Sequence, residues 1–532
     1  MPFLGLRGTR LLLAISFTAG IGFCLFGIDN AALGGVISSG PFDRRFGLDA
    51  TGQGAITGAY ELGCFAGALL VSVFGERWSR RAVLLTSVIP LMVGAALQVS
   101  TFSTAQLAVG RVVAGVGMGG ITSMLPVWQS ETSPPHLRGM LVCCSLSMLI
   151  VGQLIAYWAA YGLLQNYDTD MTWRVMFSLQ MMAGAVMAAA LLFMPESPRW
   201  LVAHNRVDEA RYILSCLEDR AEEDARLDGQ IREIISAVEL ERQSARGWSD
   251  LLKRTHDGQG EKRRMLTVGQ GGGKGLQQAV VIQVMQAFSG STVISYYVTT
   301  IFKEAIGLSD HLSTLLSGYL QVFFLVCSFG TWWLIERAGR RILFLVTAFC
   351  MATVLFLMGG MIKLNTHASG IAAAVMVFAY QAFFTWGWMA GVWVYSSEIN
   401  PLSWRSKGMG LAVALQWLFD FVLLMITPIG IANIGYGLFM LFGAFNLCFI
   451  PFVGLYCPET AGLPLESIDA LYLPGVDPVK ESKRLRKELA AARQALQGQG
   501  QGEVSLSRVA SASGKQAGDK TLAEHATSGS PT

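Results

Sequence analysis

Hydrophobic residues gather along the chain into long blocks separated by short polar connections. Each block reaches about 20 residues, the length at which a helix crosses the ~30 Å hydrocarbon core of a bilayer. Because a helix satisfies its own backbone polar groups, such a block can lie in lipid without water. The pattern predicts an all-α polytopic membrane protein with twelve transmembrane helices, at residues 11–36, 54–74, 82–100, 105–128, 140–162, 174–194, 277–302, 313–335, 341–363, 370–396, 407–430 and 435–456.

Arginine and lysine are distributed unevenly between the connections. One set of short connections holds Arg7, Arg10, Arg77, Arg80, Arg81, Arg138, Arg337, Arg340, Arg341, Arg405 and Lys407. The opposite set holds Arg44, Arg45, Arg174, Lys303 and Lys363. Basic residues concentrate in the cytoplasmic loops of membrane proteins, so both termini are predicted to be cytoplasmic.

This topology divides the chain into five segments. The central loop contains amphipathic runs that predict short surface helices. The C-terminal tail is first charged and then rich in Gly, Gln, Ser and Ala, a composition typical of disorder. We expect a cytoplasmic N-terminus at 1–10, a six-helix bundle at 11–194, a cytoplasmic loop with short helices at 195–276, a second six-helix bundle at 277–456 and a cytoplasmic, largely disordered tail at 457–532.

Composition supports a membrane protein and disfavours other classes. Only 14% of the 532 residues are charged, and the mean hydropathy is +0.45. The net charge of +3 comes from short basic clusters, which argues against nucleic-acid binding. The chain has no C-x-x-C metal spacing and no evident nucleophile–base set, so no metal, cofactor or enzymatic activity is expected.

Three charged motifs occur twice, in the same order. ERWSRR at 76–81 returns as ERAGRR at 336–341, ETSPPHLR at 131–138 as EINPLSWR at 398–405, and PESPR at 195–199 as PETAG at 458–462. The copies lie roughly 260 to 267 residues apart. Two six-helix halves of the same orientation explain this pattern, as in transporters with parallel repeats around a midplane site.

The repeated motifs place Glu and Arg together at the cytoplasmic ends of helices. Ion pairs between helices there can hold an inner gate closed and must break when the halves move. The alternative is that these charges only set topology, which would not require a repeated spacing. The predicted inner-gate network comprises Glu76, Arg77, Arg80, Arg81, Glu131, Arg138, Glu196, Arg199, Glu336, Arg337, Arg340, Arg341, Glu398, Arg405 and Glu459.

Several strings resemble the sugar porter family of the major facilitator superfamily, and particularly its fungal members. They are YELGCFAGAL (60–69), GRVVAGVGMGGITSMLPVWQSETSPPHLRG (110–139), PESPRWL (195–201), WVYSSEINPLSWRSKG (393–408) and CPETAGLPLESID (457–469). The resemblance implies the major facilitator fold, with alternating access between two bundles and substrate held at their interface. Glu76, Ser79 and Ala461 depart from the family's usual Asp, Gly and Lys.

Two charges lie within predicted spans, Asp29 in the first and Arg111 in the fourth. A charge in hydrocarbon is costly, so it usually faces a cavity or a partner. In the family, an acidic residue at this place near an arginine of the fourth span accompanies proton-coupled members. The resemblance therefore implies proton coupling by Asp29 and Arg111, and a static structural salt bridge is the alternative.

Two further acidic residues lie in predicted spans. Glu61, in the second span, is interpreted mainly as a helix-packing or hydrogen-bonding residue. Asp420, in the eleventh span, stands where relatives often have Asn. It is a candidate for a second titratable site or for altered specificity.

A sugar requires donors and acceptors for its hydroxyls and a flat apolar face for its C–H surface. The resemblance places substrate-binding candidates at Gln153, Gln286, Thr292, Trp393 and Gln416. It also suggests an outer-gate role for Tyr296 and Tyr297. Ala287 and Thr292 replace the family's usual second Gln and Asn, and Ala390 and Val392 replace usual prolines. These departures argue against high-affinity transport of ordinary hexoses.

The sequence thus predicts a secondary active transporter that carries a sugar or sugar-like polyol with protons. Facilitative uniport and a transporter-like nutrient sensor are the alternatives. The expected partners are the small molecule, the proton and the lipid bilayer, with no nucleic acid. A monomer in the plasma membrane is expected.

Overall fold

In this computed structural model, the described residues are 5–37, 39–134, 137–244, 255–256, 262–263, 271–400, 405–463, 468–472 and 476–498. Twelve helices within them are long and apolar enough to cross a membrane, from Gly8–Val36 to Tyr436–Tyr456. The prediction of twelve membrane helices is confirmed. Their ends differ from the predicted ends by a few residues, because helices extend beyond their apolar centres into the polar connections.

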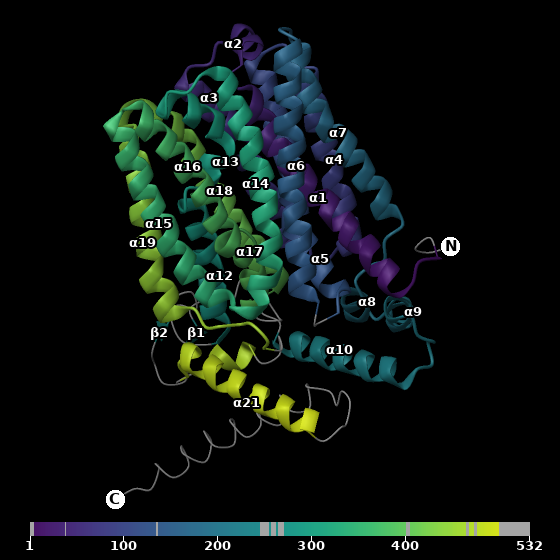
Figure 1. Cartoon of the computed structure of the whole chain (residues 1–532). Helices are drawn as coiled ribbons and strands as arrows, with labels where there is room; N and C mark the ends of the chain where they lie inside the picture. The colour runs from purple at the N-terminus through teal and green to yellow at the C-terminus, as the bar shows by residue number, and fades with distance from the viewer. Residues whose placement is uncertain are drawn as a thin grey trace, which may run out of the picture.

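The first half of the molecule contains six of these helices and one short helix (purple to blue in Figure 1). Its polar connections supply helix caps: the side chain of Asp49 accepts from Gly52 N at 2.7 Å and that of Ser79 from Ala82 N at 3.1 Å. The helices are α1 (Gly8–Val36), α2 (Gly40–Phe46), α3 (Ala50–Phe74), α4 (Arg80–Val99), α5 (Thr104–Thr132), α6 (Arg138–Asn166) and α7 (Met171–Leu192).

The second half repeats this arrangement with two interrupted spans (teal to yellow in Figure 1). Gly290 separates α12 from α13 at φ +98°, a left-handed conformation that suits glycine. A π-helix, η3, separates α16 from α17. The elements are α12 (Gly271–Phe288), α13 (Ser291–Thr300), η2 (Ile301–Ala305), α14 (Asp310–Arg337), α15 (Arg340–Leu364), α16 (His367–Phe384), η3 (Thr385–Met389), α17 (Ala390–Ile399), α18 (Arg405–Ile434) and α19 (Tyr436–Tyr456).

Smaller elements cover the lower end of the bundles in Figure 1. The segment between the halves contains α8 (Pro198–Ala203), α9 (Val207–Glu218), α10 (Ala225–Ser244), β1 (Thr255–His256) and β2 (Lys262–Arg263). After α19 come η5 (Asp469–Tyr472) and α21 (Pro478–Gly498). The composition predicts a largely disordered tail here, but residues 478–498 form a helix. This stretch is rich in helix-forming Lys, Arg, Glu, Ala and Leu, and Arg484 pairs with Glu488 one turn later. The tail beyond residue 498 lies outside the described residues.

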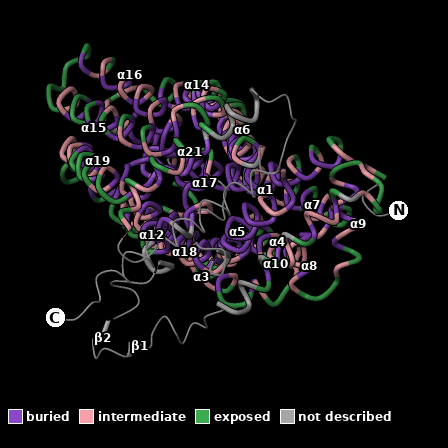
Figure 2. The backbone as a smooth tube through the Cα atoms, turned by 90° about the horizontal axis from the view of Figure 1, so that it is seen from below, coloured by how far each residue is buried: buried purple, intermediate pink, exposed green. Residues whose placement is uncertain are grey.

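The two halves meet along two pairs of long helices, α3 against α18 and α6 against α14. Buried residues concentrate along this seam when the molecule is seen from below (Figure 2). At the upper end, Tyr157 of α6 donates to the carbonyl of Ser295 in α13 at 2.9 Å. At the lower end, Lys407 of α18 forms an ion pair of 2.7 Å with Glu76. The halves therefore touch at both ends and enclose the groups between them.

Candidate functional site

The predicted pair of intramembrane charges forms a buried ion pair. Arg111 of α5 places Nη1 3.3 and 3.2 Å from the two carboxylate oxygens of Asp29 in α1. The two side chains are 0% and 1% exposed. The guanidinium also lies over the ring of Tyr60, 4.5 Å from its centroid. The ring and the carboxylate together offset the cost of burying this cation.

Two more carboxyls lie next to α13. Tyr296 donates a hydrogen bond of 2.5 Å to Oε1 of Glu61, which is fully buried in α3. Thr292, one turn earlier on α13, donates at 2.7 Å to Oδ1 of Asp420 in α18. Positions four residues apart share a helix face. One face of α13 therefore binds an acidic residue from each half of the protein.

The amide candidates of the second half are in direct contact. Gln416 of α18 donates to Oε1 of Gln286 in α12 at 3.0 Å. The amide nitrogen of Gln286 donates to the carbonyls of Trp388 and Met389 at 2.8 and 3.3 Å. Both carbonyls belong to the π-helix η3, where the regular helical bonding pattern is altered. The interrupted tenth span thus orients the amide at the end of α12.

The other two pocket candidates come from opposite halves and are both buried. Gln153 of α6 is 2% exposed, and its Oε1 has no hydrogen-bond partner among the described residues. Trp393 of α17 is 5% exposed and packs edge-to-face on Phe23 of α1, with centroids 6.5 Å apart. An unpaired buried polar atom costs about 1–3 kcal/mol. A hydroxyl-rich molecule held between the halves would satisfy the oxygen of Gln153.

The outer-gate candidates lie on α13 at the seam. Both are buried, Tyr296 being 2% and Tyr297 1% exposed. Tyr297 donates to the carbonyl of Leu424 in α18 at 3.3 Å and is also hydrogen-bonded to Thr57 of α3. Tyr296 reaches across to Glu61. The backbone of α13 also packs closely on α1, since a side chain at Gly34 would lie 2.7 Å from the carbonyl oxygen of Tyr296.

The repeated charged motifs form the same arrangement in each half. Arg80 pairs with Glu131 at 3.2 Å and donates to the carbonyl five residues before it, that of Gly75. Arg340 pairs with Glu398 at 3.0 Å and donates to the carbonyl of Ile335, again five residues before it. The sequence repeat is therefore a repeat of structure.

The third motif caps the helices that begin at these arginines. Glu196 accepts from the backbone nitrogens of Arg80 and Arg81 at 3.0 and 3.2 Å. Glu459 accepts from those of Arg340 and Arg341 at 3.0 and 3.1 Å. A carboxylate at a helix N-terminus satisfies unpaired N–H groups and interacts favourably with the helix dipole.

The other predicted gate residues have varied surroundings. The side chains of Arg81 and Arg341 donate to the carbonyls of Met194 and Gly454. Arg77 is exposed, and Arg337 stacks on Trp333. Glu336 pairs with Arg340, and Arg199 interacts electrostatically with Glu131. The side chains of Arg138 and Arg405 lie outside the described residues.

These ion pairs join helices within one half, and other residues link the halves at the lower end. Lys407 pairs with Glu76, and its carbonyl accepts from Ser72 at 2.9 Å. A side chain at Gly139 of α6 would clash with the carboxylate of Glu336 and lie 3.1 Å from the guanidinium of Arg340. The gate network of the second half therefore lies against the first half.

Gln283 is a further residue that was not predicted from the sequence. Its amide is wholly buried, and neither polar atom is paired among the described residues. Its spacing of three residues from Gln286 on the same helix was the available signal.

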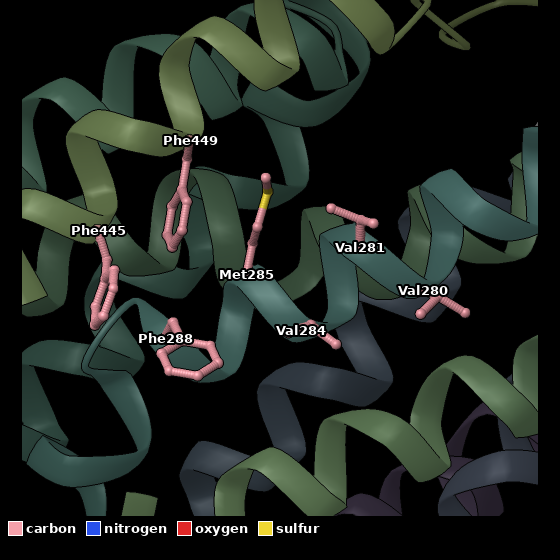
Figure 3. A pocket seen from close by; sticks show the side chains of 7 residues that line it. All are labelled: Val280, Val281, Val284, Met285, Phe288, Phe445 and Phe449. Atoms are coloured by element: carbon pink, nitrogen blue, oxygen red, sulfur yellow. The ribbon is translucent and has the colours of Figure 1, made fainter. Parts of the chain in front are cut away.

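A separate hollow of about 250 Å³ has only hydrophobic walls and offers a sugar no hydrogen bonds (Figure 3). It is lined by Val280, Val281, Val284, Met285, Phe288, Phe445 and Phe449. Among the described residues, no group of three or more His, Cys, Asp or Glu residues could hold a metal ion.

The arrangement of two six-helix halves around a buried polar seam defines the class of major facilitator transporters. Residues 15–472 match the model of the family described as sugar (and other) transporter. The chain belongs to this family, whose members are transporters and not enzymes, and it is an integral membrane protein.

Individual relatives extend over most of the chain. The MFS-type transporter oryC of Aspergillus oryzae is 33% identical over 480 residues, covering 88% of this chain and 87% of the relative. The sugar transporter STL1 of Saccharomyces cerevisiae is 32% identical over 504 residues, covering 91% and 86%. A structure of the proton:xylose symporter XylE, a protein from E. coli, has the same fold, with a TM-score of 0.74 and 24% identity over 87% of this chain and all of that one.

Proposed function

We propose that this protein is a proton-coupled symporter of a sugar or sugar-like polyol that works by alternating access. The observation that carries the proposal is the ion pair between Asp29 of α1 and Arg111 of α5, which is fully buried. A buried pair of this kind is costly to maintain for stability alone. A carboxylate that loses its arginine when helices move takes up a proton, and it releases the proton when the pair reforms.

The polar groups at the seam support a neutral, hydroxyl-rich substrate. Gln153, Gln286 and Gln416 provide amide donors and acceptors from both halves, and Trp393 provides an aromatic surface. Each hydrogen bond to a bound hydroxyl contributes about 0.5–1.5 kcal/mol. Similarity to the yeast sugar transporter STL1 supports the same substrate class.

Alternating access requires ends that open in turn. We propose that the lower end in Figure 1 faces the cytoplasm, with Lys407 and Glu76 closing it and Tyr296 and Tyr297 closing the other end. The concentration of arginine and lysine in the lower connections supports this orientation, and we propose the plasma membrane as the location.

The test is uptake by the purified protein in proteoliposomes, using radiolabelled D-glucose, D-xylose, glycerol, sorbitol and myo-inositol. We expect one or more probes to accumulate when an inward proton gradient is imposed, and accumulation to collapse when a protonophore is added. Entry that only equilibrates, with or without the gradient, would identify a uniporter instead. Absence of entry for all five would contradict the substrate class.

A further inference from the structure

Glu61 and Asp420 are not needed for the pairing of Asp29 with Arg111, yet both are buried in the same region. Neutral groups donate the hydrogen bonds that reach their carboxyls among the described residues: Tyr296 donates to Glu61, and Thr292 and the amide of Gln416 donate to Asp420. The second oxygen of Glu61, Oε2, is buried without a hydrogen-bond partner among these residues.

The charges around Glu61 and Asp420 do not balance. Arg111, the cation with which Glu61 interacts electrostatically, already forms its ion pair with Asp29. The carboxyls of Glu61 and Asp420 are also close enough to repel one another when both are ionised. The other titratable side chains that interact with this pair are Asp29 of α1, Cys64 of α3, Arg111 of α5 and Tyr296 of α13.

An isolated carboxylate removed from water is so costly that the group accepts a proton instead. Two carboxyls that share one site cannot both remain ionised. We propose that Glu61 and Asp420 form a second proton-carrying pair, bridged by α13 and separate from the pair of Asp29 and Arg111. This inference deepens the proposed symport, on which its role in transport rests.

The bridge explains how movement would let the pair exchange protons with water. Tyr296 contacts Glu61 across the seam, so separation of the halves at the upper end removes this donor and admits water. Thr292 and Tyr296 are both on α13, which Gly290 separates from α12, so one tilt of α13 alters both contacts. The pair takes up a proton from this water before α13 closes, and it gives the proton up to water, leaving a carboxylate, when the halves open at the lower end.

Infrared difference spectroscopy of the purified protein at neutral pH tests this pair without any substrate. The readout is the C=O stretching band that protonated carboxyls show and carboxylates do not. We expect Glu61→Gln and Asp420→Asn each to remove a band, or both to remove the same band if one proton is shared. Tyr296→Phe should shift the band that Glu61→Gln removes, and Thr292→Val the band that Asp420→Asn removes.

The matched control is Asp168→Asn, because this carboxylate is exposed and paired with Arg44, and it should leave every band in place. Spectra unchanged by both Glu61→Gln and Asp420→Asn would overturn the proposal, and would mean an ionised acidic site suited to a cationic substrate. Loss of a band in only one of the two would also overturn it, since there would be no pair. Because the bands are measured without transport, they test whether Glu61 and Asp420 are protonated even if substrate uptake is not coupled to protons.

Discussion

Arg111 reaches both carboxylate oxygens of Asp29 with the single nitrogen Nη1, while Nε and Nη2 of the same guanidinium have no hydrogen-bond partner among the described residues. An Arg–carboxylate contact that bonded through two nitrogens would be stronger and more rigid. The observed contact is therefore one that a small movement of α1 against α5 can break.

Asp29→Asn should abolish accumulation of substrate against a gradient while leaving exchange between equal concentrations partly intact. The amide cannot ionise, so proton binding is lost, whereas the amide contacts for the substrate remain. Counterflow and gradient-driven uptake in the same proteoliposomes measure the two effects. Concentrative uptake by the variant would show that Asp29 is not the coupling residue.

Gln286→Ala and Gln416→Ala should each weaken substrate binding several-fold, and the double variant should cost less than the sum of the two. The reason is that each amide orients the other through the hydrogen bond between them, so removal of one already disturbs its partner. Trp393→Ala should weaken binding further by removing the aromatic surface. Binding affinities for the four proteins of the cycle provide the check, and strict additivity would argue against a shared substrate site.

Arg340→Ala should slow transport more than Arg341→Ala, although both arginines belong to the same motif. Arg340 holds two carboxylates and lies against Gly139 of the other half, whereas the side chain of Arg341 donates to a carbonyl of its own half. Loss of the contacts made by Arg340 should shift the equilibrium between the states open at the upper and at the lower end by about 1–3 kcal/mol. Initial rates at matched expression are the measurement. Equal rates in both variants and the wild type would mean that the charges of this motif only set the membrane topology.

The double change Ala287→Gln with Thr292→Asn should raise hexose uptake, because it restores amides that the sugar porter family usually carries there. Thr292 also donates to Asp420, so the matched comparison is the same pair of changes combined with Asp420→Asn. D-Glucose uptake by the three proteins measures the effect. Background uptake in both variants would mean that positions 287 and 292 do not select the substrate.

The sequence predicted those features that depend on local composition. Apolar block length predicts the spans, and the isolated charges in two of them identify Asp29 and Arg111 as candidates. The matched spacing of the motifs anticipates that Arg80 and Arg340 have equivalent surroundings. Contacts between the halves could not be predicted in this way. The bond from Tyr296 to Glu61 joins residues 235 positions apart, and no periodicity of either helix relates them.

The interruption of the tenth membrane helix could not be predicted from the sequence either. The π-helix at Thr385–Met389 carries no proline and lies within a continuous apolar block, so its two carbonyls for Gln286 became evident only in three dimensions. The helix at 478–498 was missed for a different reason, because its charged residues resemble those of a disordered tail until their spacing is placed on a helix.

The most direct test of proton-coupled transport is the pH inside proteoliposomes when a transported probe is added outside, with no proton gradient imposed beforehand. A pH-sensitive dye in the lumen should report acidification that begins with probe entry, scales with its rate and disappears in Asp29→Asn. Probe entry without any change in lumenal pH, in the wild-type protein, would contradict the account.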